Sequence, residues 1–337
     1  MQSSGIHVVT GATGQVGLEL CRGLRTAGRP VRAVVLPRDP AIARLQANGV
    51  EVVVADVRDL AALRASFTGA DTIYHLAAMV STSARHDPRL WQVNVEGPRN
   101  AAQAALAVGA RRLLYFSSIV VFDPAPFDQP LSETRARLPV SQGSPYVRSK
   151  VVGEQVVRAA VARGLDAVIV HPTVVIGPNE THHIGVVQSL LVAYFDRKLP
   201  ATFRGGFNAV AIGDLVAGAI AAAERGRTGE SYILGGAHAS LTQILERSRP
   251  LCDAPVPKFS IPLGLARSGL PVVNAVARLT RSRPAFTHED LRQLAGNTRI
   301  SSQKAAQELG YRHDGLDEAL RMVHAEWTVG RAAAMKR

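Results

Sequence analysis

The segment TGATGQVG, residues Thr10 to Gly17, decides the fold. It follows the apolar run IHVV and leads into LELCRGL, where apolar residues recur with helical spacing. Gly11, Gly14 and Gly17 let the backbone turn tightly, approach a pyrophosphate closely and pack a helix against a sheet. The N-terminus of that helix favours the negative charge of a phosphate. The segment therefore predicts a strand, a phosphate-binding loop and a helix.

Around this segment, β-branched runs alternate with stretches rich in Ala and Leu. The runs IHVVTG, PVRAVVL and VEVVVAD are separated by QVGLELCRGLRTAG and IARLQANG, and the pattern resumes at TIYHLAA, RRLLYFSS and DAVIVHP. Continuous apolar strands separated by helices are typical of a parallel sheet covered on both faces. We therefore predict the α/β fold class, with a doubly wound parallel sheet of the Rossmann type.

The alternation is lost after Pro172, where Pro, Gly and Arg become frequent. A second, smaller, mostly helical substrate lobe is expected to begin there. Residues 207–236 show the strand and helix pattern again, which predicts a return of the chain to the first domain. The predicted dinucleotide-binding domain is therefore 1–175 with the return at 207–236, and the predicted substrate lobe is 176–206 and 237–330.

Composition narrows the class of protein. Of the 337 residues, 47% are hydrophobic and 20% are charged, which is ordinary for a globular protein. No run reaches the roughly 18 apolar residues of a membrane-spanning helix, and we expect no signal peptide. Cys21 and Cys252 are too few for a disulfide framework or a structural zinc site, so a reducing cytoplasm is the expected location.

The chain is strongly basic. Its net charge is +12, from 39 Lys and Arg against 27 Asp and Glu, which favours an anionic ligand such as a dinucleotide phosphate or a nucleic acid. The basic residues are mostly scattered arginines, without a dense run interleaved with aromatic residues. We therefore expect an arginine-rich solvated surface and no nucleic-acid partner.

The residues at the ends of the second and third predicted strands indicate how the dinucleotide binds. An acid at the end of the second strand pairs with the ribose in NAD sites, whereas arginine accommodates the extra phosphate of NADP. Here the strand ends in Val35-Leu36-Pro37-Arg38, and Arg38, together with Arg32, favours NADP(H) over NAD(H). The alternative is that Arg38 only faces solvent. Asp56, at the end of the third strand, is suited either to contact the cofactor or to form a cap or turn.

Tyr146 and Lys150 are four residues apart in GSPYVRSKVVGEQVV, so their side chains share one face of a predicted helix. A phenol needs nearby positive charge to act as an acid or base at neutral pH, and the ammonium supplies it. The earlier strand RRLLYFSS ends in Ser117 and Ser118, at the carboxyl edge where doubly wound folds bind ligands. Ser118 is placed to bond a substrate oxygen. The candidate catalytic residues are therefore Ser118, Tyr146 and Lys150.

The order of the motifs resembles that of the extended short-chain dehydrogenases/reductases, the superfamily of NAD-dependent epimerases and dehydratases. This order covers most of the chain: TGATGQVG, the pair Asp56-Val57, HLAA from His75, NVEGPRN from Asn94, YFSS, YVRSK and HPTVVIGP. Within that branch, FNAVAIGDLVAG, SYILGG and KAAQELGY are similar to dihydroflavonol reductases, 3β-hydroxysteroid dehydrogenases and hopanoid-associated sugar epimerase-like proteins.

The resemblance implies further roles. Asn94 would tie the helix to the active-site strands, Asp56-Val57 would contact the adenine, and the backbone of Thr173 to Val175 would meet the nicotinamide amide. It also implies a homodimer, paired through helices that include the Tyr-Lys segment. The predicted cofactor-binding residues are Gly11, Thr13, Gly14, Gln15, Val16, Arg38, Asp56, Val57, Leu76, Ala77, Ala78, Ser117, Tyr146, Lys150, Pro172, Thr173, Val174 and Val175.

Other features have a functional and a structural interpretation. His171 stands where relatives often have arginine, and Ile176 where an aromatic residue is frequent, so substrate contacts are expected to differ. His182 and His183 are adjacent on a loop and lack the spacing of metal ligands, so we expect a substrate lid and no metal. The stretch IPLGLARSGLPVVNAVARL is expected to cover the core of the smaller lobe, the alternative being an interfacial helix.

These features predict an NAD(P)H-dependent ketoreductase, which reduces a ketone of a small, fairly apolar substrate or oxidises the corresponding alcohol. The substrate pocket is expected between Met79–Ser83, Val120 and residues 177–207. Because Arg197 and Arg204 could bind a diphosphate, a sugar nucleotide remains an alternative substrate. One alternative is a nucleotide-sugar epimerase or dehydratase with tightly bound NAD. Another is a non-catalytic dinucleotide sensor that binds a protein partner, because one fold serves many functions.

Overall fold

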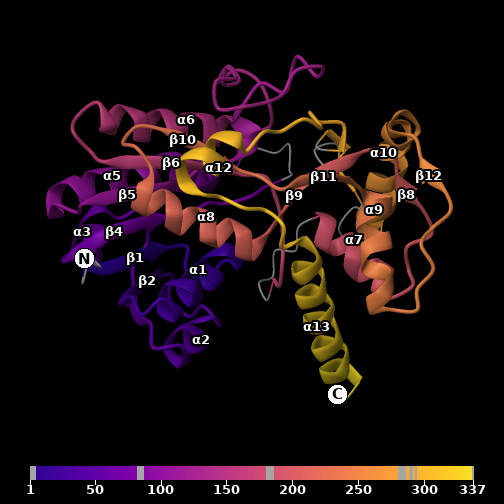
Figure 1. Cartoon of the computed structure of the whole chain (residues 1–337), viewed down its shortest axis with the longest axis horizontal. Helices are drawn as coiled ribbons and strands as arrows, with labels where there is room; N and C mark the ends of the chain where they lie inside the picture. The colour runs from indigo at the N-terminus through magenta and orange to yellow at the C-terminus, as the bar shows by residue number, and fades with distance from the viewer. Residues whose placement is uncertain are drawn as a thin grey trace.

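The computed structural model describes residues 5–81, 87–179, 186–279, 286–287, 291–292 and 294–335. Its largest element is a seven-stranded parallel sheet in the order β10-β6-β5-β4-β1-β2-β3 (Figure 1). The chain moves outward from β1 to β3 and then crosses back to β4, so the strand order reverses beside β1. The strands are β1 (Ile6–Thr10), β2 (Val31–Val35), β3 (Glu51–Val54), β4 (Ala70–His75), β5 (Arg112–Phe116), β6 (Ala167–Pro172) and β10 (Ser231–Leu234).

Helices cover both faces of this sheet, because its strands are apolar on both sides. In β5, Leu113 and Tyr115 pack into the core on one face, and Leu114 and Phe116 pack into the core on the other. This is the doubly wound arrangement that the sequence predicts. One face is covered by α3 (Leu60–Phe67), α5 (Gly97–Val108) and α6 (Pro145–Val161). The opposite face is covered by α1 (Gln15–Thr26), α2 (Ile42–Ala47), α8 (Ile212–Arg225) and α12 (Gln303–Leu309).

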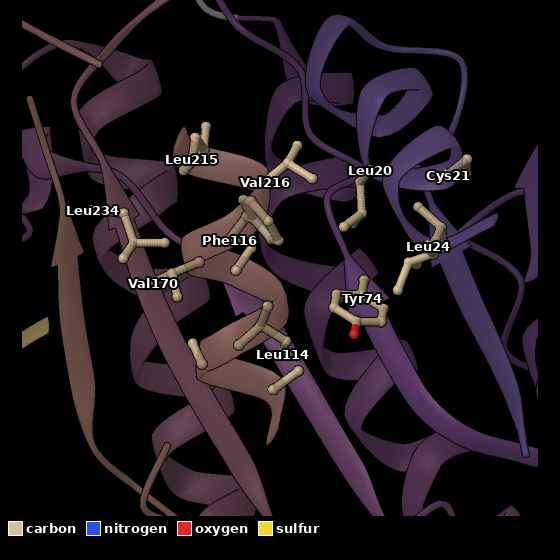
Figure 2. Close-up of a cluster of buried hydrophobic side chains, with 14 of the residues drawn as sticks. Leu20, Cys21, Leu24, Tyr74, Leu114, Phe116, Val170, Leu215, Val216 and Leu234 are labelled. Atoms are coloured by element: carbon tan, nitrogen blue, oxygen red, sulfur yellow. The ribbon is translucent and has the colours of Figure 1, made fainter. Parts of the chain in front are cut away.

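Figure 2 shows the core on the second of these faces. Leu114 and Phe116 of β5 lie between Leu24 of α1 and Leu215 of α8, and each of these four side chains is buried. Burying such a side chain contributes about 1.5–3 kcal/mol, so this interface holds α1, and with it the glycine loop, firmly on the sheet.

A smaller lobe follows β6, as the sequence predicts. It contains a three-stranded sheet in the order β11-β9-β7, a two-stranded sheet of β12 and β8, and several helices around a second apolar core. The strands are β7 (Val174–Ile176), β8 (Thr202–Phe203), β9 (Gly206–Ala211), β11 (Ala237–Ser240) and β12 (Ser260–Ile261). The helices are α7 (Val186–Phe195), α9 (Leu241–Ser248), η3 (Arg249–Leu251), α10 (Leu263–Leu279) and α13 (Leu316–Met335).

The chain crosses between the two lobes repeatedly. Of the segment 207–236, β9 pairs within the smaller lobe, whereas α8 and β10 lie on the large sheet. α12 comes from the range 237–330 and packs against α8 and β10. Three short elements complete the described chain: α4 (Pro88–Trp91), the π-helix η1 (Gln92–Glu96) and the 3-10 turn η2 (Ile119–Val121). Within the described ranges, every helix is too short or too polar to cross a bilayer.

Candidate active site

The glycine loop between β1 and α1 leaves no room for a side chain at Gly11 or Gly17. Gly11 has φ +68°, and a Cβ there would lie 2.7 Å from the backbone nitrogen of Ala77. A Cβ on Gly17 would lie 2.2 Å from the carbonyl oxygen of Gly11. Gly14 is the N-cap of α1 and provides no side-chain cap, so the first N–H groups of the helix can face an anion. This geometry fits a dinucleotide pyrophosphate.

The predicted cofactor residues meet at one edge of the sheet, because they follow the carboxyl ends of parallel strands beside the reversal of strand order. One of them, Thr173, has a buried hydroxyl oxygen with no hydrogen-bond partner among the described residues, which suits a polar group of a bound nicotinamide. The residues are Gly11, Thr13, Gly14, Gln15 and Val16 after β1, Arg38 after β2, Asp56 and Val57 after β3, Leu76, Ala77 and Ala78 after β4, Ser117 after β5, and Pro172, Thr173, Val174 and Val175 from the end of β6 into β7.

Lys150 on α6 is buried and held against the end of β5. Its Nζ donates a 2.7 Å hydrogen bond to the carbonyl oxygen of Phe116 and lies 4.9 Å from the ring centre of Tyr115. Burial lowers the pKa of the Lys150 ammonium to about 8, although the nearby carboxylate of Glu154 opposes this shift. Lys150 is therefore still mostly protonated at neutral pH, and two of its three N–H donors remain for other groups.

Tyr146 lies in the first turn of α6. The helix begins at Pro145, which suits the first helical position, and Ser144 accepts a 3.4 Å hydrogen bond from the Val147 nitrogen as the N-cap. The half-buried Tyr146 side chain, like that of Val120, packs against a small apolar cluster that includes Val121 of η2. The local sequence therefore presents the tyrosine beside the turn that follows β5.

Ser118 lies at that same turn. Its Oγ accepts a 3.4 Å hydrogen bond from the backbone nitrogen of Val120 and so caps η2. Lys150 is bonded to Phe116, two residues earlier, and Tyr146 packs against η2, directly after. The structure thus places the three predicted catalytic residues around the carboxyl end of β5.

Asn94 joins three parts of this site, and the role expected for it is confirmed. It lies in the π-helix η1, an irregularity often found at functional sites. Its side chain accepts a 2.8 Å hydrogen bond from the Met79 nitrogen and donates at 2.9 Å to both the Met79 oxygen and Ser149 Oγ. Ser149 donates in turn to the Tyr146 carbonyl oxygen at 2.7 Å. The loop after β4 and the first turn of α6 are thereby fixed to each other.

Thr10 and His75 tie the glycine loop to the loop after β4. Thr10 Oγ1 and His75 Nδ1 are hydrogen-bonded at 2.9 Å, and Thr10 Oγ1 also accepts a 3.3 Å bond from the Ala77 nitrogen. Burial, assisted by the positive charge of Lys150, lowers the pKa of His75 to about 3, so the imidazole is neutral. Its part here is to hold the backbone of residues 76–78 in place.

Glu154 is the residue of this region that the sequence analysis missed. It is 1% exposed, and its carboxylate accepts hydrogen bonds from Ser117 (2.8 Å), His171 (2.7 Å), Arg137 (3.0 Å) and Arg158 (2.9 Å). Burial alone would raise the pKa of Glu154, but these partners hold it well below its usual range. A signal was present, since Glu154 is the one acid of α6 and stands four residues after Lys150.

His171 takes part in this network as a buried hydrogen-bond partner of Glu154. Burial lowers the pKa of His171, against the opposing effect of the Glu154 charge, and its Nε2–H donates to Glu154 at 2.7 Å. The ring also packs on Phe122, with 4.7 Å between ring centres. His171 therefore points into the protein at the end of β6.

Asp56 and Arg32 are both engaged by protein groups. Asp56 accepts from the backbone nitrogen of Arg58 at 2.9 Å and pairs with its guanidinium at 2.6 Å, which holds the pKa of Asp56 below its usual range. It thus forms the turn, one of its two predicted uses. Arg32 lies near the amino end of β2 and pairs with Glu51. The expectation that it adds charge at the cofactor edge is wrong, because that edge is at the opposite end of the strand.

Arg38 stands at the cofactor edge. It follows β2 after the exposed Leu36, has φ +62° and an exposed side chain, and pairs with no residue in the part of the chain that the structure describes. The neighbouring acid, Asp39, accepts a 2.9 Å hydrogen bond from the Ala41 nitrogen. The Arg38 guanidinium is thus available to bind a ligand at this edge, while the Asp39 carboxylate is hydrogen-bonded to the backbone.

A polar chain links the glycine loop to the smaller lobe. The Gln15 side chain donates to the Gly177 oxygen at 3.0 Å and to Gln188 of α7 at 3.4 Å. Glu326 of α13 accepts from the Asn179 nitrogen at 2.8 Å and from Gln188 at 3.3 Å. These bonds set the position of β7 and α7 over the cofactor edge.

Some predicted features fall outside the described residues. They are Ser83 of the expected pocket and the pair His182 and His183. In the part of the chain that the structure describes, no three His, Cys, Asp or Glu side chains come close enough to hold a metal ion.

Comparisons with known proteins agree with this architecture. Residues 7–235 match the NAD dependent epimerase/dehydratase family. The chain is 32% identical to sterol demethylase protein B of Methylococcus capsulatus over 90% of its own length and 92% of that protein, and 30% identical to a putative dihydroflavonol 4-reductase of Synechocystis over 93% and 91%. The crystal structure of gox2253 superposes with a TM-score of 0.82 at 28% identity, over 97% and 98% of the two chains. The chain belongs to the NAD-dependent epimerase/dehydratase family, within the extended short-chain dehydrogenases/reductases.

Proposed function

We propose that this enzyme is a ketoreductase in which Ser118, Tyr146 and Lys150 act on the carbonyl group of a small, apolar substrate, or on the corresponding secondary alcohol in reverse. The observation that carries the proposal is the buried Lys150 ammonium, fixed by Phe116 beside the turn that bears Ser118 and against which Tyr146 packs. A cation held there stabilises negative charge on a phenolic oxygen.

The chemistry divides among the three side chains. The nicotinamide, when bound, supplies the hydride for reduction or accepts it for oxidation. Tyr146 gives its hydroxyl proton to the substrate oxygen, and Ser118 donates a hydrogen bond to the same oxygen. Lys150 stabilises the phenolate that remains and has donors left for the ribose. Because Asn94 and Ser149 fix the first turn of α6, the tyrosine needs little reorganisation to reach the oxygen.

An apolar substrate suits the residues around this site. Val80 is 69% exposed after β4, and Val120 is part of the partly buried apolar surface beside Tyr146. Two relatives point the same way by their names, the sterol demethylase protein and a farnesyl-dihydroquinoline-oxide ketoreductase of Stigmatella aurantiaca, 27% identical over 90% of each chain. We infer a hydrophobic ketone for this chain as well.

The proposed cofactor is NADP(H) in preference to NAD(H). Support comes from the exposed Arg38 after β2 and from the absence of an acid at the end of that strand in the sequence. A guanidinium binds a phosphate with two directed hydrogen bonds, so Arg38 would recognise the 2′-phosphate. The homodimer implied by the resemblance remains a proposal, paired through helices that include α6 with its Tyr-Lys segment.

Absorbance of NADPH, with NADH in parallel, tests the function on a panel of cyclic, aromatic and aliphatic ketones. We expect consumption by the wild type and a loss of at least a hundredfold in Tyr146→Phe. Tyr74→Phe is the matched control, because the Tyr74 hydroxyl is buried and has no partner among the described residues. Turnover of a nucleotide sugar without net change in the nicotinamide would instead establish an epimerase. Full activity in Tyr146→Phe would reject both.

A further inference from the structure

Helix α10 carries three of its large apolar side chains on its solvent side. Leu265, Val272 and Leu279 are spaced by seven residues and are 66%, 66% and 88% exposed. The spacing places them on one face of the helix, along about 20 Å of its length at 1.5 Å per residue. Phe259, 77% exposed, precedes the same helix. We call these four residues the α10 stripe.

The opposite face of α10 is already buried against the core of the smaller lobe. Its buried side chains are Ala266, Leu270 and Ala277, so the predicted covering role is confirmed for that face. Two of these three inward residues are alanines, whereas the outward stripe carries leucine, valine and phenylalanine. A surface helix normally shows the reverse, with polar residues outward. Several large apolar side chains exposed along one helix face mark an interaction surface.

The charge around the stripe identifies the surface that it fits. Lys258 and Arg267 are exposed, and neither forms an ion pair with a residue that the structure describes. A second copy of the same face would bring like charges together. An exposed apolar stripe with one unpaired cation beside Phe259 and another on α10 is complementary to a bilayer with anionic headgroups.

We propose that α10 is an interfacial helix that binds this protein to the surface of an anionic membrane, with the α10 stripe inserted among the lipid headgroups. α10 lies at the end of the smaller lobe that is far from the large sheet, so the cofactor edge remains accessible to solvent in this orientation (Figure 1). This inference goes beyond the proposed function, because binding to the membrane requires no activity.

Co-sedimentation with vesicles tests the proposal. The full chain is mixed with vesicles of phosphatidylcholine alone or with 30% phosphatidylglycerol, roughly the anionic content of a charged leaflet. We expect binding to the anionic vesicles that weakens as salt is raised. The triple variant Leu265→Asn, Val272→Asn, Leu279→Asn should lower the partition coefficient at least tenfold. The double variant Lys258→Gln, Arg267→Gln should lower it several-fold on anionic vesicles only.

A matched triple variant separates the stripe from general surface hydrophobicity. Val54, Leu106 and Val140 are also exposed, at 57%, 39% and 39%, and lie outside α10, so their replacement by Asn should leave vesicle binding unchanged. Circular dichroism confirms that each variant is folded. Equal binding by both triple variants, or no binding by the wild type, would overturn the proposal. So would a stable oligomer in light scattering that only the α10 variant dissociates, because a second copy would then cover the stripe.

Discussion

Glu154 Oε2 lies 2.7 Å from Nε2 of the buried His171, and the same oxygen accepts the hydroxyl of Ser117 at 2.8 Å. One carboxylate thus connects the ends of β5 and β6, the two strands that lead to the candidate catalytic serine and the expected nicotinamide segment. Its other oxygen faces Arg137 and Arg158. The network holds two neighbouring strand ends of the site in register.

Glu154→Gln should destabilise the fold by about 3 kcal/mol, because it leaves two arginines beside a buried position without their counter-charge. Urea unfolding measures the change. The control is Glu230→Gln, which breaks the partly exposed pair with Lys304 and should cost less than about 1 kcal/mol. Equal effects of the two variants would show that the buried network contributes no more than a surface pair.

Lys150 predicts the alkaline limit of activity. Its pKa is lowered to about 8 by burial, so the ammonium loses its proton as the pH rises through about 8. Deprotonation removes the positive charge that stabilises the Tyr146 phenolate. The value of kcat/KM for ketone reduction should therefore fall about tenfold per pH unit above that point. Lys150→Met should be nearly inactive at every pH. A profile that stays flat to pH 10 would contradict this role.

Arg38 predicts the choice of cofactor. Arg38→Ala should raise the KM for NADPH about tenfold, the effect of losing one charge-assisted pair, and should leave the KM for NADH nearly unchanged. The control is Arg64→Ala, which removes an exposed arginine of α3. If Arg38→Ala changes the KM for NADPH and the KM for NADH by the same factor, Arg38 does not bind the 2′-phosphate.

We expect the buried His7 to contribute to the loss of folding stability at acid pH. Burial lowers its pKa from 6.5 to about 4, so the unfolded chain binds a proton that the folded chain does not. This stability is present above pH 6.5 and is lost as the pH falls from 6.5 toward 4, by about 1.4 kcal/mol per pH unit. Urea unfolding between pH 7 and 5 should show a shallower slope in His7→Phe. An unchanged slope would mean that His7 does not contribute.

Sequence alone predicts the sheet and most of the cofactor edge, because these depend on local patterns. Alternating apolar strands and helices determine the doubly wound order, and each strand end then delivers its motif to one edge. The same logic places Tyr146 and Lys150 on one helix. The same reasoning excludes Arg32 from the cofactor edge, since a residue near the start of a strand lies far from its carboxyl end.

Contacts between distant segments account for what the sequence does not predict. Arg137 reaches Glu154 from a loop that has no regular period, and Gln15 meets Gly177 across 162 residues. The periodicity of α10 shows that the helix is apolar, but the side that faces the core depends on how the smaller lobe packs. Such pairings follow from the packed structure and not from spacing.

Deuterium labelling follows the proposed transfer of hydride to a carbonyl carbon, with the proton supplied by Tyr146. The enzyme is given a reducible ketone and NADPH that carries deuterium at the transferable C4 position, and the product is analysed by mass spectrometry. The account predicts an alcohol with one deuterium on the former carbonyl carbon in the wild type and no such product in Tyr146→Phe. Unlabelled alcohol, or undiminished product in Tyr146→Phe, would contradict it.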